Sequence, residues 1–432
     1  MKLKELSLSN FRAFEDLELK FDSQTTVIIG HNGAGKTSIL DAIAMCMTHL
    51  TGNLLSDSAG YDIDAWFVDH DIMNEKNEGF CSAVLQDNVF NEGKEFQIMV
   101  KKERNSVGIN FEIHPNNSFE GVKSKLKNNQ IDSIPIIAYF NVHRTYPSER
   151  KVESRKTYNS LLFAYDRSLS LKNPNFRTFE VWYLQQVIEE NALKVDTKNF
   201  DIELPSLKYI RSTLNEFLSI IEPNTFGNIS TKSDSTTLPN FEVDTKPYLT
   251  IEKLGNEISM SQLSDGERMI ISLVVEIGRR LTIANKIDPS NGNGIVLIDK
   301  IELHLHPKWQ NTIIKALEQT FPNLTFIVTT HSPLVLSSVR KSAIKVLQDY
   351  QEIPNDSLPD IYTGTADEVL EDLMAADENY NPYKAELKEI DKLFNDLKFD
   401  LANDKLQKLK VELNSSPRWL EEYETRLDFV RS

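Results

Sequence analysis

The segment GHNGAGKT at residues 30–37 has the residue types and spacing of a loop that binds nucleotide phosphates. Its glycines would let successive backbone N–H groups converge on the phosphates without interference from a β-carbon. Lys36 is expected to reach the β- and γ-phosphates, and the Thr37 hydroxyl is expected to hold Mg²⁺. The segment therefore predicts a nucleotide site. The alternative is a glycine-rich turn that fits the pattern by chance.

Both flanks of this loop favour the nucleotide site. The apolar run Val27–Ile29 predicts a buried strand before the loop, and Ile39, Leu40, Ile43 and Met47 follow it at helical spacing. A strand, a glycine loop and a helix in this order form the context that such a loop requires. The positive end of the helix would then point at the phosphates.

Three further segments carry groups suited to the same chemistry. Asp299 ends the apolar run Gly294–Ile298 and could orient Mg²⁺ through water, or it could be a surface aspartate after a strand. The segment SDGE, residues 264–267, precedes a helical pattern, so it could face an anion or act only as a helix cap. His331 follows the apolar run 324–329 and could be catalytic or structural.

The 432 residues are enough for an α/β core with appended parts. Period-two alternation predicts two strands over residues 3–21, an antiparallel meander over 81–113 and a buried strand over 134–140. Helical spacing begins near residues 176 and 207, followed by a loop over 224–240 and a hairpin over 248–260. We expect four regions, with bounds 1–145, 146–247, 248–350 and 351–432; the second is a helical insertion and the fourth is a tail of short amphipathic helices.

Composition excludes several classes of protein. The formal net charge of -16 argues against a wholly basic coat for nucleic acid, although local groups such as Lys123, Lys125 and Lys127 or residues 150–156 could form a groove. No window approaches eighteen apolar residues, so we expect no membrane span and a cytoplasmic location. Cys46 and Cys81 are too few for a disulfide framework or a zinc site.

Five motifs, in this order, resemble those of ABC-type ATPase heads of the RecF/SMC-related and OLD-like groups. They are NFR (10–12), GHNGAGKT (30–37), LSDGER (263–268), IVLID (295–299) with ELHLHP (302–307), and TTHSP (329–333). Within these groups, PIIAYFNVHR (135–144), FEVWYLQQVIEENALK (179–194) and the tail after IYTGTADEVLEDL (361–373) are most similar to PtuA-type ATPases of Septu and retron antiphage systems. The resemblance covers nearly the whole chain and implies an α/β P-loop head with a helical insertion and a C-terminal helical tail.

The resemblance implies a head that dimerises around ATP. The residues then expected to bind ATP on one subunit are Arg12, Asn32, Gly33, Gly35, Lys36, Thr37 and Ser38. Thr37 and Asp299 would hold Mg²⁺, and His331 would sense the γ-phosphate. Ser264, Gly266 and Glu267 of the other subunit would close over that phosphate, with Leu303–His306 crossing the dimer seam. The glutamine that usually lines the metal site is not placed, and Asn141 is a positional guess.

The chain departs from the family at the residue after Asp299. The family normally has a glutamate that positions the attacking water there, and this chain has Lys300. A lysine with an ordinary pKa near 10.4 is protonated at neutral pH and cannot accept a proton. We therefore expect an ATP-binding head that hydrolyses very slowly. The alternative is that Glu302 replaces the missing base, but two residues further on it is expected to lie in the loop toward the other subunit, beyond the reach of about 3 Å that a base needs.

The resemblance favours an ATP-binding regulatory subunit of an antiphage complex, partnered by an HNH nuclease and contacting nucleic acid, if at all, through that complex. The competing prediction is a RecF/SMC-like DNA-repair ATPase that acts directly on DNA. An OLD-like nuclease would need a further Toprim domain. The residues after 350 are helical in pattern and too few for a typical domain of about 100–150 residues.

Overall fold

The computed structural model describes residues 1–55, 67–142, 160–169, 176–237, 243–354, 384–395 and 398–413, with Tyr423, Thr425 and Leu427. The chain divides into two compact units, Met1–Met374 and Ala375–Ser432. The basic residues 150–156 lie outside the described residues.

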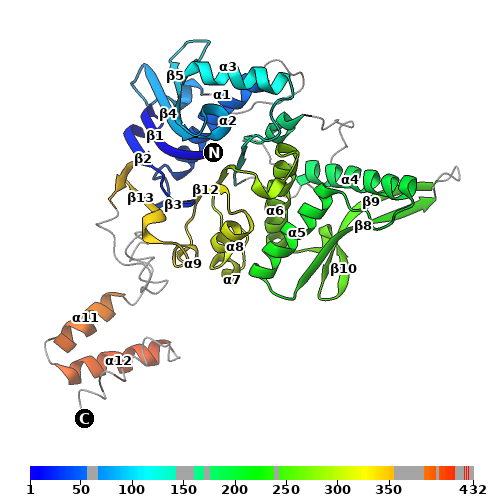
Figure 1. Ribbon diagram of the computed structural model, residues 1–432. Coiled ribbons are helices and arrows are strands. Elements are labelled where there is room, and N and C mark those ends of the chain that lie inside the picture. The colour runs from blue at the N-terminus through cyan, green and yellow to red at the C-terminus, as the bar shows by residue number, and fades with distance from the viewer. Residues whose placement is uncertain are drawn as a thin grey trace. The chain divides into compact units, whose positions relative to one another are not determined.

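A six-stranded sheet forms the centre of the first unit, in the order β14-β13-β3-β12-β11-β7 (Figure 1). Its strands are β3 (Thr25–Gly30), β7 (Ile136–Phe140), β11 (Gly294–Ile298), β12 (Leu324–Thr329), β13 (Ile344–Gln348) and β14 (Gln351–Ile353). All neighbours are parallel except the β13–β14 pair. Every residue of β3, β7, β11 and β12 is buried, as continuous apolar runs in a parallel sheet predict. The predicted strands before the glycine loop, before Asp299 and before His331 are confirmed.

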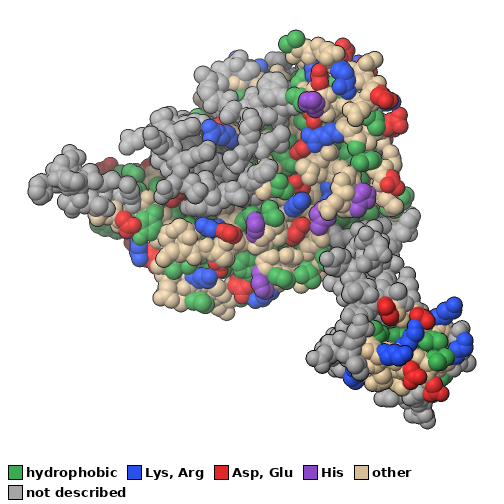
Figure 2. Space-filling model, turned by 180° about the vertical axis from the view of Figure 1, so that it is seen from behind, with side chains coloured by type: hydrophobic (Ala, Val, Ile, Leu, Met, Phe, Trp, Pro, Cys, Tyr) green, Lys and Arg blue, Asp and Glu red, His purple; other side chains and the backbone are tan. Residues whose placement is uncertain are grey.

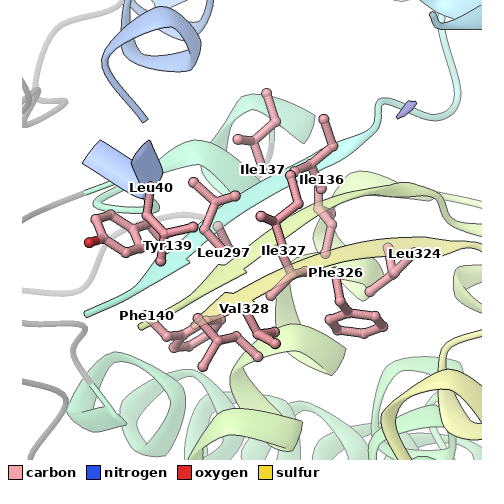
Figure 3. Packing of buried hydrophobic residues seen from close by; sticks show 14 of the residues in the cluster. Leu40, Ile136, Ile137, Tyr139, Phe140, Leu297, Leu324, Phe326, Ile327 and Val328 are labelled. Carbon is pink, nitrogen blue, oxygen red and sulfur yellow. The ribbon is translucent and has the colours of Figure 1, made fainter. Parts of the chain in front are cut away.

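The register of this sheet sorts its side chains into two packed faces. Leu297 lies opposite Tyr139 and Ile327, while Ile298 lies opposite Phe140 and Val328. In Figure 3, Leu40 lies beside Tyr139 on one face, and Phe140 and Val328 lie on the other. The carboxyl ends of β3, β11 and β12 consequently meet at one edge, where the polar residues that follow them come together.

Helix α1 (Lys36–Leu55) packs between the parallel sheet and a second, antiparallel sheet, since it contacts strands of both. The second sheet has the order β2-β1-β4-β5-β6 and comprises β1 (Lys2–Phe11), β2 (Phe14–Lys20), β4 (Glu78–Gln86), β5 (Glu95–Glu103) and β6 (Asn110–His114). Helix α1 is apolar on nearly every side, as a helix buried between two layers must be. The predicted strand pair and meander are confirmed. Cys46 and Cys81 are buried in this region and unpaired.

Residues 176–259 form an insertion arm, which we define as α4 (Phe176–Thr197), α5 (Pro205–Ile221) and the sheet of β8 (Phe226–Thr237), β9 (Val243–Lys253) and β10 (Asn256–Ser259). These elements project together from one side of the unit in Figure 1. The predicted hairpin near Gly255 is confirmed. The predicted loop over residues 224–240 is wrong, because β8 pairs along its length with β9. Residues 232–235 of this strand are exposed, and its Ser and Thr residues do not give the apolar alternation from which a half-buried strand is predicted.

Helix α6 (Asp265–Ala284) connects the arm to the parallel sheet, since it packs against α5 and β7. Glu276 in this helix is buried and pairs with Arg279 and Arg280, at 2.7 Å in each case. Arg280 also donates to the carbonyl of Ala164. The remaining short helices are α2 (Asn88–Asn91), α3 (Asn116–Lys127), α7 (Pro307–Gln310), α8 (Ile313–Thr320), α9 (Pro333–Leu336), and the 3-10 turns Asp69–Asp71, Leu161–Tyr165, Met260–Gln262, Pro289–Asn291 and Lys341–Ala343.

The second unit contains helices α11 (Lys384–Asn395) and α12 (Phe399–Leu413), consistent with the predicted helical tail. Its buried cluster joins Ile390 and Phe394 of α11 to Ala402, Leu406 and Leu409 of α12 and to Leu427. Part of the apolar face predicted for the tail therefore packs within the tail itself.

The described surface carries both signs of charge. Figure 2 shows Lys and Arg side chains interspersed with Asp and Glu on the face turned to the viewer, without a continuous basic field. Of the helices that the structure describes, none has the length and apolar content to cross a membrane.

Candidate nucleotide-binding site

The glycine loop between β3 and α1 needs glycine at two positions for steric reasons. Gly33 and Gly35 have φ angles of 85° and 94°, which side chains with a β-carbon rarely adopt. A β-carbon on Gly35 would lie 2.3 Å from Cζ of Phe14. The predicted loop is therefore formed as expected, with its backbone close against the antiparallel sheet.

Lys36 lies under this loop, with its ammonium group already bound. Its Nζ donates to the carbonyl oxygens of Gly30 at 2.8 Å and His31 at 2.9 Å. Burial lowers the pKa of Lys36 to about 8, although the charge of Asp299 opposes the shift. The two carbonyls hold the side chain across the loop, in the position from which a phosphate-binding lysine acts.

The Thr37 hydroxyl and the Asp299 carboxylate meet directly below the loop. Thr37 Oγ1 donates to Asp299 Oδ2 at 3.0 Å, and Thr329 Oγ1 donates to Asp299 Oδ1 at 2.5 Å. One hydroxyl and one carboxylate, beside a phosphate loop, fit Mg²⁺, which prefers oxygen ligands and takes several of them from water and phosphates. No cluster of three His, Cys, Asp or Glu side chains suited to a metal occurs among the described residues, so a bound ion would depend on the nucleotide.

The Arg12 guanidinium is bonded to side chains of α1 and of the turn Asp69–Asp71. It donates to Asp41 Oδ2 at 2.6 Å, to Asp71 Oδ1 at 2.8 Å and to Ser38 Oγ at 3.2 Å. Burial opposes the charge, but the two carboxylates outweigh it and raise the pKa of Arg12. Tyr139 donates to the other oxygen of Asp41 at 2.9 Å. The cluster fixes the first turn of α1, and Arg12 as a direct ATP ligand stays a prediction.

The loops after β11 and β12 are joined by their side chains. Lys300 has a φ of 49°, and its N–H donates to Thr329 Oγ1 at 2.8 Å. The Glu302 carboxylate accepts from Thr330 Oγ1 at 2.7 Å and from the N–H of His331 at 3.0 Å. Glu302 is thereby bonded, within its own chain, to the loop that carries His331. That the loop of Glu302 also faces a second subunit stays a prediction. Burial, and then the charge of Lys36, lower the pKa of His331.

The residues of the LSDGER motif (263–268) lie at the N-terminus of α6, at a cavity separate from the glycine loop. Ser264 is the N-cap, and the Glu267 carboxylate accepts from its N–H at 2.9 Å and from Lys253 Nζ at 2.6 Å. Ser264, Gly266 and Glu267 line a cavity of about 610 Å³ together with residues 304–306, 308 and 309. No residue of the glycine loop lines this cavity. An anion at Ser264 would therefore come from outside this nucleotide site.

The loop Leu303–His306 packs against the LSDGER motif at the start of α6. A β-carbon on Gly266 would lie 2.3 Å from the carbonyl oxygen of His304, so the loop backbone touches α6. Nδ1 of His306 accepts from the N–H of Lys308 and caps α7. Whether the loop crosses a dimer seam stays a prediction.

Several site residues were outside the reach of sequence reasoning. Asp41 and Asp71 belong to no motif, and Tyr139 lies in PIIAYFNVHR without an assigned role, so only the contacts of these residues with Arg12 or with one another reveal them. Thr329 and Thr330 were visible as part of TTHSP but had no assigned role. Asn32 lies in the loop as expected, and Asn141 is buried after β7, at the edge where the N–H of Asp299 donates to the Phe140 carbonyl.

The family model described as AAA ATPase domain matches residues 1–336. The chain belongs to this family. Membership implies ATP binding, which agrees with the Lys36 loop and the Thr37–Asp299 pair.

Individual proteins similar to this AAA ATPase indicate which members of the family it resembles. A Vibrio cholerae protein described as Retron Vc95 probable ATPase is 33% identical over 393 residues, which cover 81% of this chain and 74% of the relative. Septu protein PtuA of Bacillus thuringiensis is 23% identical, covering 96% of this chain and 94% of the relative. The solved SMC head domain from Thermotoga maritima matches at 14% identity with a TM-score of 0.43, covering 82% of this chain and 99% of that domain. The predicted relationship to retron and PtuA-type ATPases is confirmed.

Proposed function

We propose that this chain is the ATP-binding regulatory subunit of an antiphage defence complex and that it holds and controls an HNH-type nuclease. The observation that carries the proposal is the contact of Thr37 Oγ1 with Asp299 Oδ2 at 3.0 Å, directly beneath the glycine loop. It joins the phosphate loop to the strand-end carboxylate that ATP with Mg²⁺ requires. Homology to retron and Septu ATPases supports the defence role.

Each residue has a defined part in this proposal. Lys36 and the backbone of the glycine loop bind the phosphates, and Thr37 and Asp299 hold Mg²⁺. The ion would supply charge neutralisation for the β- and γ-phosphates. His331 faces the terminal phosphate. Lys300 stands where a base is expected and favours bound ATP over its hydrolysis, because it is a cation.

The proposal includes assembly of two or more copies through the nucleotide edge. Ser264 and Gly266 line a cavity away from their own glycine loop, so a phosphate there would belong to a second copy. Nucleotide occupancy would then set the oligomeric state and, through it, the nuclease.

Calorimetry with ATP and Mg²⁺ tests the binding site. Lys36→Ala should weaken ATP by several tenfold steps, each worth about 1.4 kcal/mol, because a charge-assisted contact is lost. Lys345→Ala is the matched control, since Lys345 lies on the neighbouring strand β13 but pairs with Glu352. Equal ATP affinity of the parent and Lys36→Ala proteins would remove the nucleotide site.

Mass measurement and co-purification test the assembly. The parent should form a dimer or larger species with ATP, and Ser264→Arg should prevent it while leaving the fold intact. A nuclease encoded beside this chain should co-purify with the parent. A strictly monomeric parent with ATP bound, or a parent that retains no nuclease, would contradict the corresponding part of the proposal.

A further inference from the structure

The turn after β11 brings a second carboxylate to the nucleotide edge. Backbone bonds from Leu303 N–H to the Lys300 carbonyl and from Leu305 N–H to the Glu302 carbonyl form this turn. The N–H of Ile301 donates to the Thr329 carbonyl at 3.0 Å and ties the turn to β12. The position of Glu302 is therefore fixed by main-chain bonds on both sides of it.

The Glu302 carboxylate uses both of its oxygens on the loop that carries His331. Oε2 accepts from Thr330 Oγ1, and Oε1 accepts from the backbone N–H of His331. Thr330 is completely buried, and its Oγ1 also accepts from the N–H of Ser332 at 3.0 Å. The Glu302 carboxylate thus holds Thr330 and His331 directly, and Ser332 through Thr330. Hydrogen bonds to a charged acceptor are stronger than those between neutral groups.

A second bridge runs parallel to the first. Ser332 Oγ donates to Gln310 Oε1 at 2.6 Å, and Gln310 Nε2 donates to the Leu305 carbonyl at 2.9 Å. The loop after β12 is therefore attached at two points to the segment after β11. The two bridges restrict the direction in which the side chain of His331 can lie.

The charge of Glu302 also suits its surroundings. Lys36 and Lys300 both bring positive charge to His331, whereas Glu302 and Asp299 oppose it. Burial has the largest effect on the pKa of Lys36 and lowers it. The carboxylates of Asp299 and Glu302 act in the opposite direction and raise this pKa. Glu302 consequently faces the same group of charges that a triphosphate would meet.

We propose that Glu302 is a positioning residue of the ATP site: its carboxylate fixes the backbone of His331, and so presents that side chain to the terminal phosphate. This inference rests on the proposed function, since it requires ATP at the glycine loop. It assigns Glu302 no contact with the nucleotide and no role as a base. Its effect is therefore confined to ligands that carry a γ-phosphate.

Calorimetry of the full chain with Mg–ATP and Mg–ADP tests the proposal. Glu302→Ala should weaken ATP at least tenfold and leave ADP within twofold of the parent. Glu302→Gln keeps the shape and one acceptor, so its ATP affinity should be intermediate. Glu318→Gln is the matched control, because Glu318 accepts from Thr25 Oγ1 at 2.6 Å at the opposite end of β3. It should change neither affinity.

A double-mutant cycle separates positioning from a general structural effect. If Glu302 acts through His331, adding Glu302→Gln to His331→Ala should cause no further loss of ATP affinity. Equal losses for ATP and ADP, additive losses in the cycle, or ATP affinity unchanged in Glu302→Gln would each overturn the proposal. Should Glu302→Ala fail to fold, the Gln variant and the cycle decide. If the parent protein binds neither ATP nor ADP, both the proposed function and this inference are wrong. If the parent binds both nucleotides, the proposed nucleotide site is retained even when the variants contradict this inference.

Discussion

Helices α1 and α6 both begin in a segment predicted to meet phosphate, and their first turns differ. Helix α1 has no acidic residue in its first turn, and its end is left to glycines and Lys36. Helix α6 has Asp265 and Glu267 in its first turn, and its Ser264–Glu267 capping box uses the N–H groups of Ser264 and Glu267. A helix end that needs an anion can leave its donors open, whereas a capped end is satisfied within its own chain. The α1 end is therefore the more open of the two, whereas part of the α6 end is already bonded within its own chain.

The largest expected effect concerns reaction chemistry at the α1 end. Lys300→Glu should raise the rate of phosphate release from ATP by about 10²–10⁴-fold, because it restores a base that can position water. Lys300→Met is the control that removes the charge without adding a base, and it should give no comparable rise. If both variants hydrolyse ATP at the parent rate, the base assignment at residue 300 fails.

The glycines of the two helix ends give a matched pair of substitutions. Gly35→Ala should weaken ATP at least tenfold, since a φ of 94° and the Phe14 ring together impose a strain of about 1–3 kcal/mol. Gly266→Ala meets an equally close neighbour, the His304 carbonyl, but should leave ATP binding by a single copy unchanged. Calorimetry with ATP, at protein concentrations too low for the copies to assemble, distinguishes the two variants. Similar losses of ATP affinity in both would contradict the difference proposed between the two helix ends.

The capping box predicts a difference in stability. Glu267→Gln should lower the free energy of unfolding by about 1–2 kcal/mol, because the bonds from Ser264 and Lys253 lose their charged acceptor. Asp265→Asn, in the same turn but exposed and paired with Arg268, should change it by less than about 0.5 kcal/mol. Chemical denaturation measures both, and equal effects would mean that the cap is unimportant.

The smallest expected effect is the acid sensitivity of the α6 end. Burial opposes the ionisation of Glu267, but Lys253 and Ser264 prevail and lower its pKa from the ordinary value of 4.5. A lowered carboxylate pKa contributes stability above pH 4.5, and this contribution is lost as pH falls through the folded-state value. Thermal melts from pH 7 to pH 3 should therefore show a steeper loss for the parent than for Glu267→Gln. Parallel curves would contradict the assignment.

Sequence patterns predicted those parts of the molecule whose local residue pattern matches the burial of the same residues in the fold. The glycine loop, the strands before Asp299 and His331, and the meander follow directly from apolar periodicity and glycine spacing. Strand β8 was missed because its alternating Ser and Thr residues lack an apolar face. The bonds of Glu302 to Thr330 and His331 were not predicted, because a residue count gives distance along a chain but not the direction of a turn, and Lys300 adopts a left-handed conformation directly after Asp299. The Arg12 cluster depends on contacts between residues far apart in sequence, which no single motif contains.

The two carbonyls that bind Lys36 have a consequence for the entropy of ligand binding. A free lysine side chain loses about 1.5–2 kcal/mol of rotamer entropy when it becomes ordered. In this protein the ammonium group donates to two carbonyls of its own loop, those of Gly30 and His31, so part of that loss accompanies folding. A phosphate bound at this loop then meets a lysine side chain whose rotamers are already restricted, so less of the binding free energy is lost to entropy.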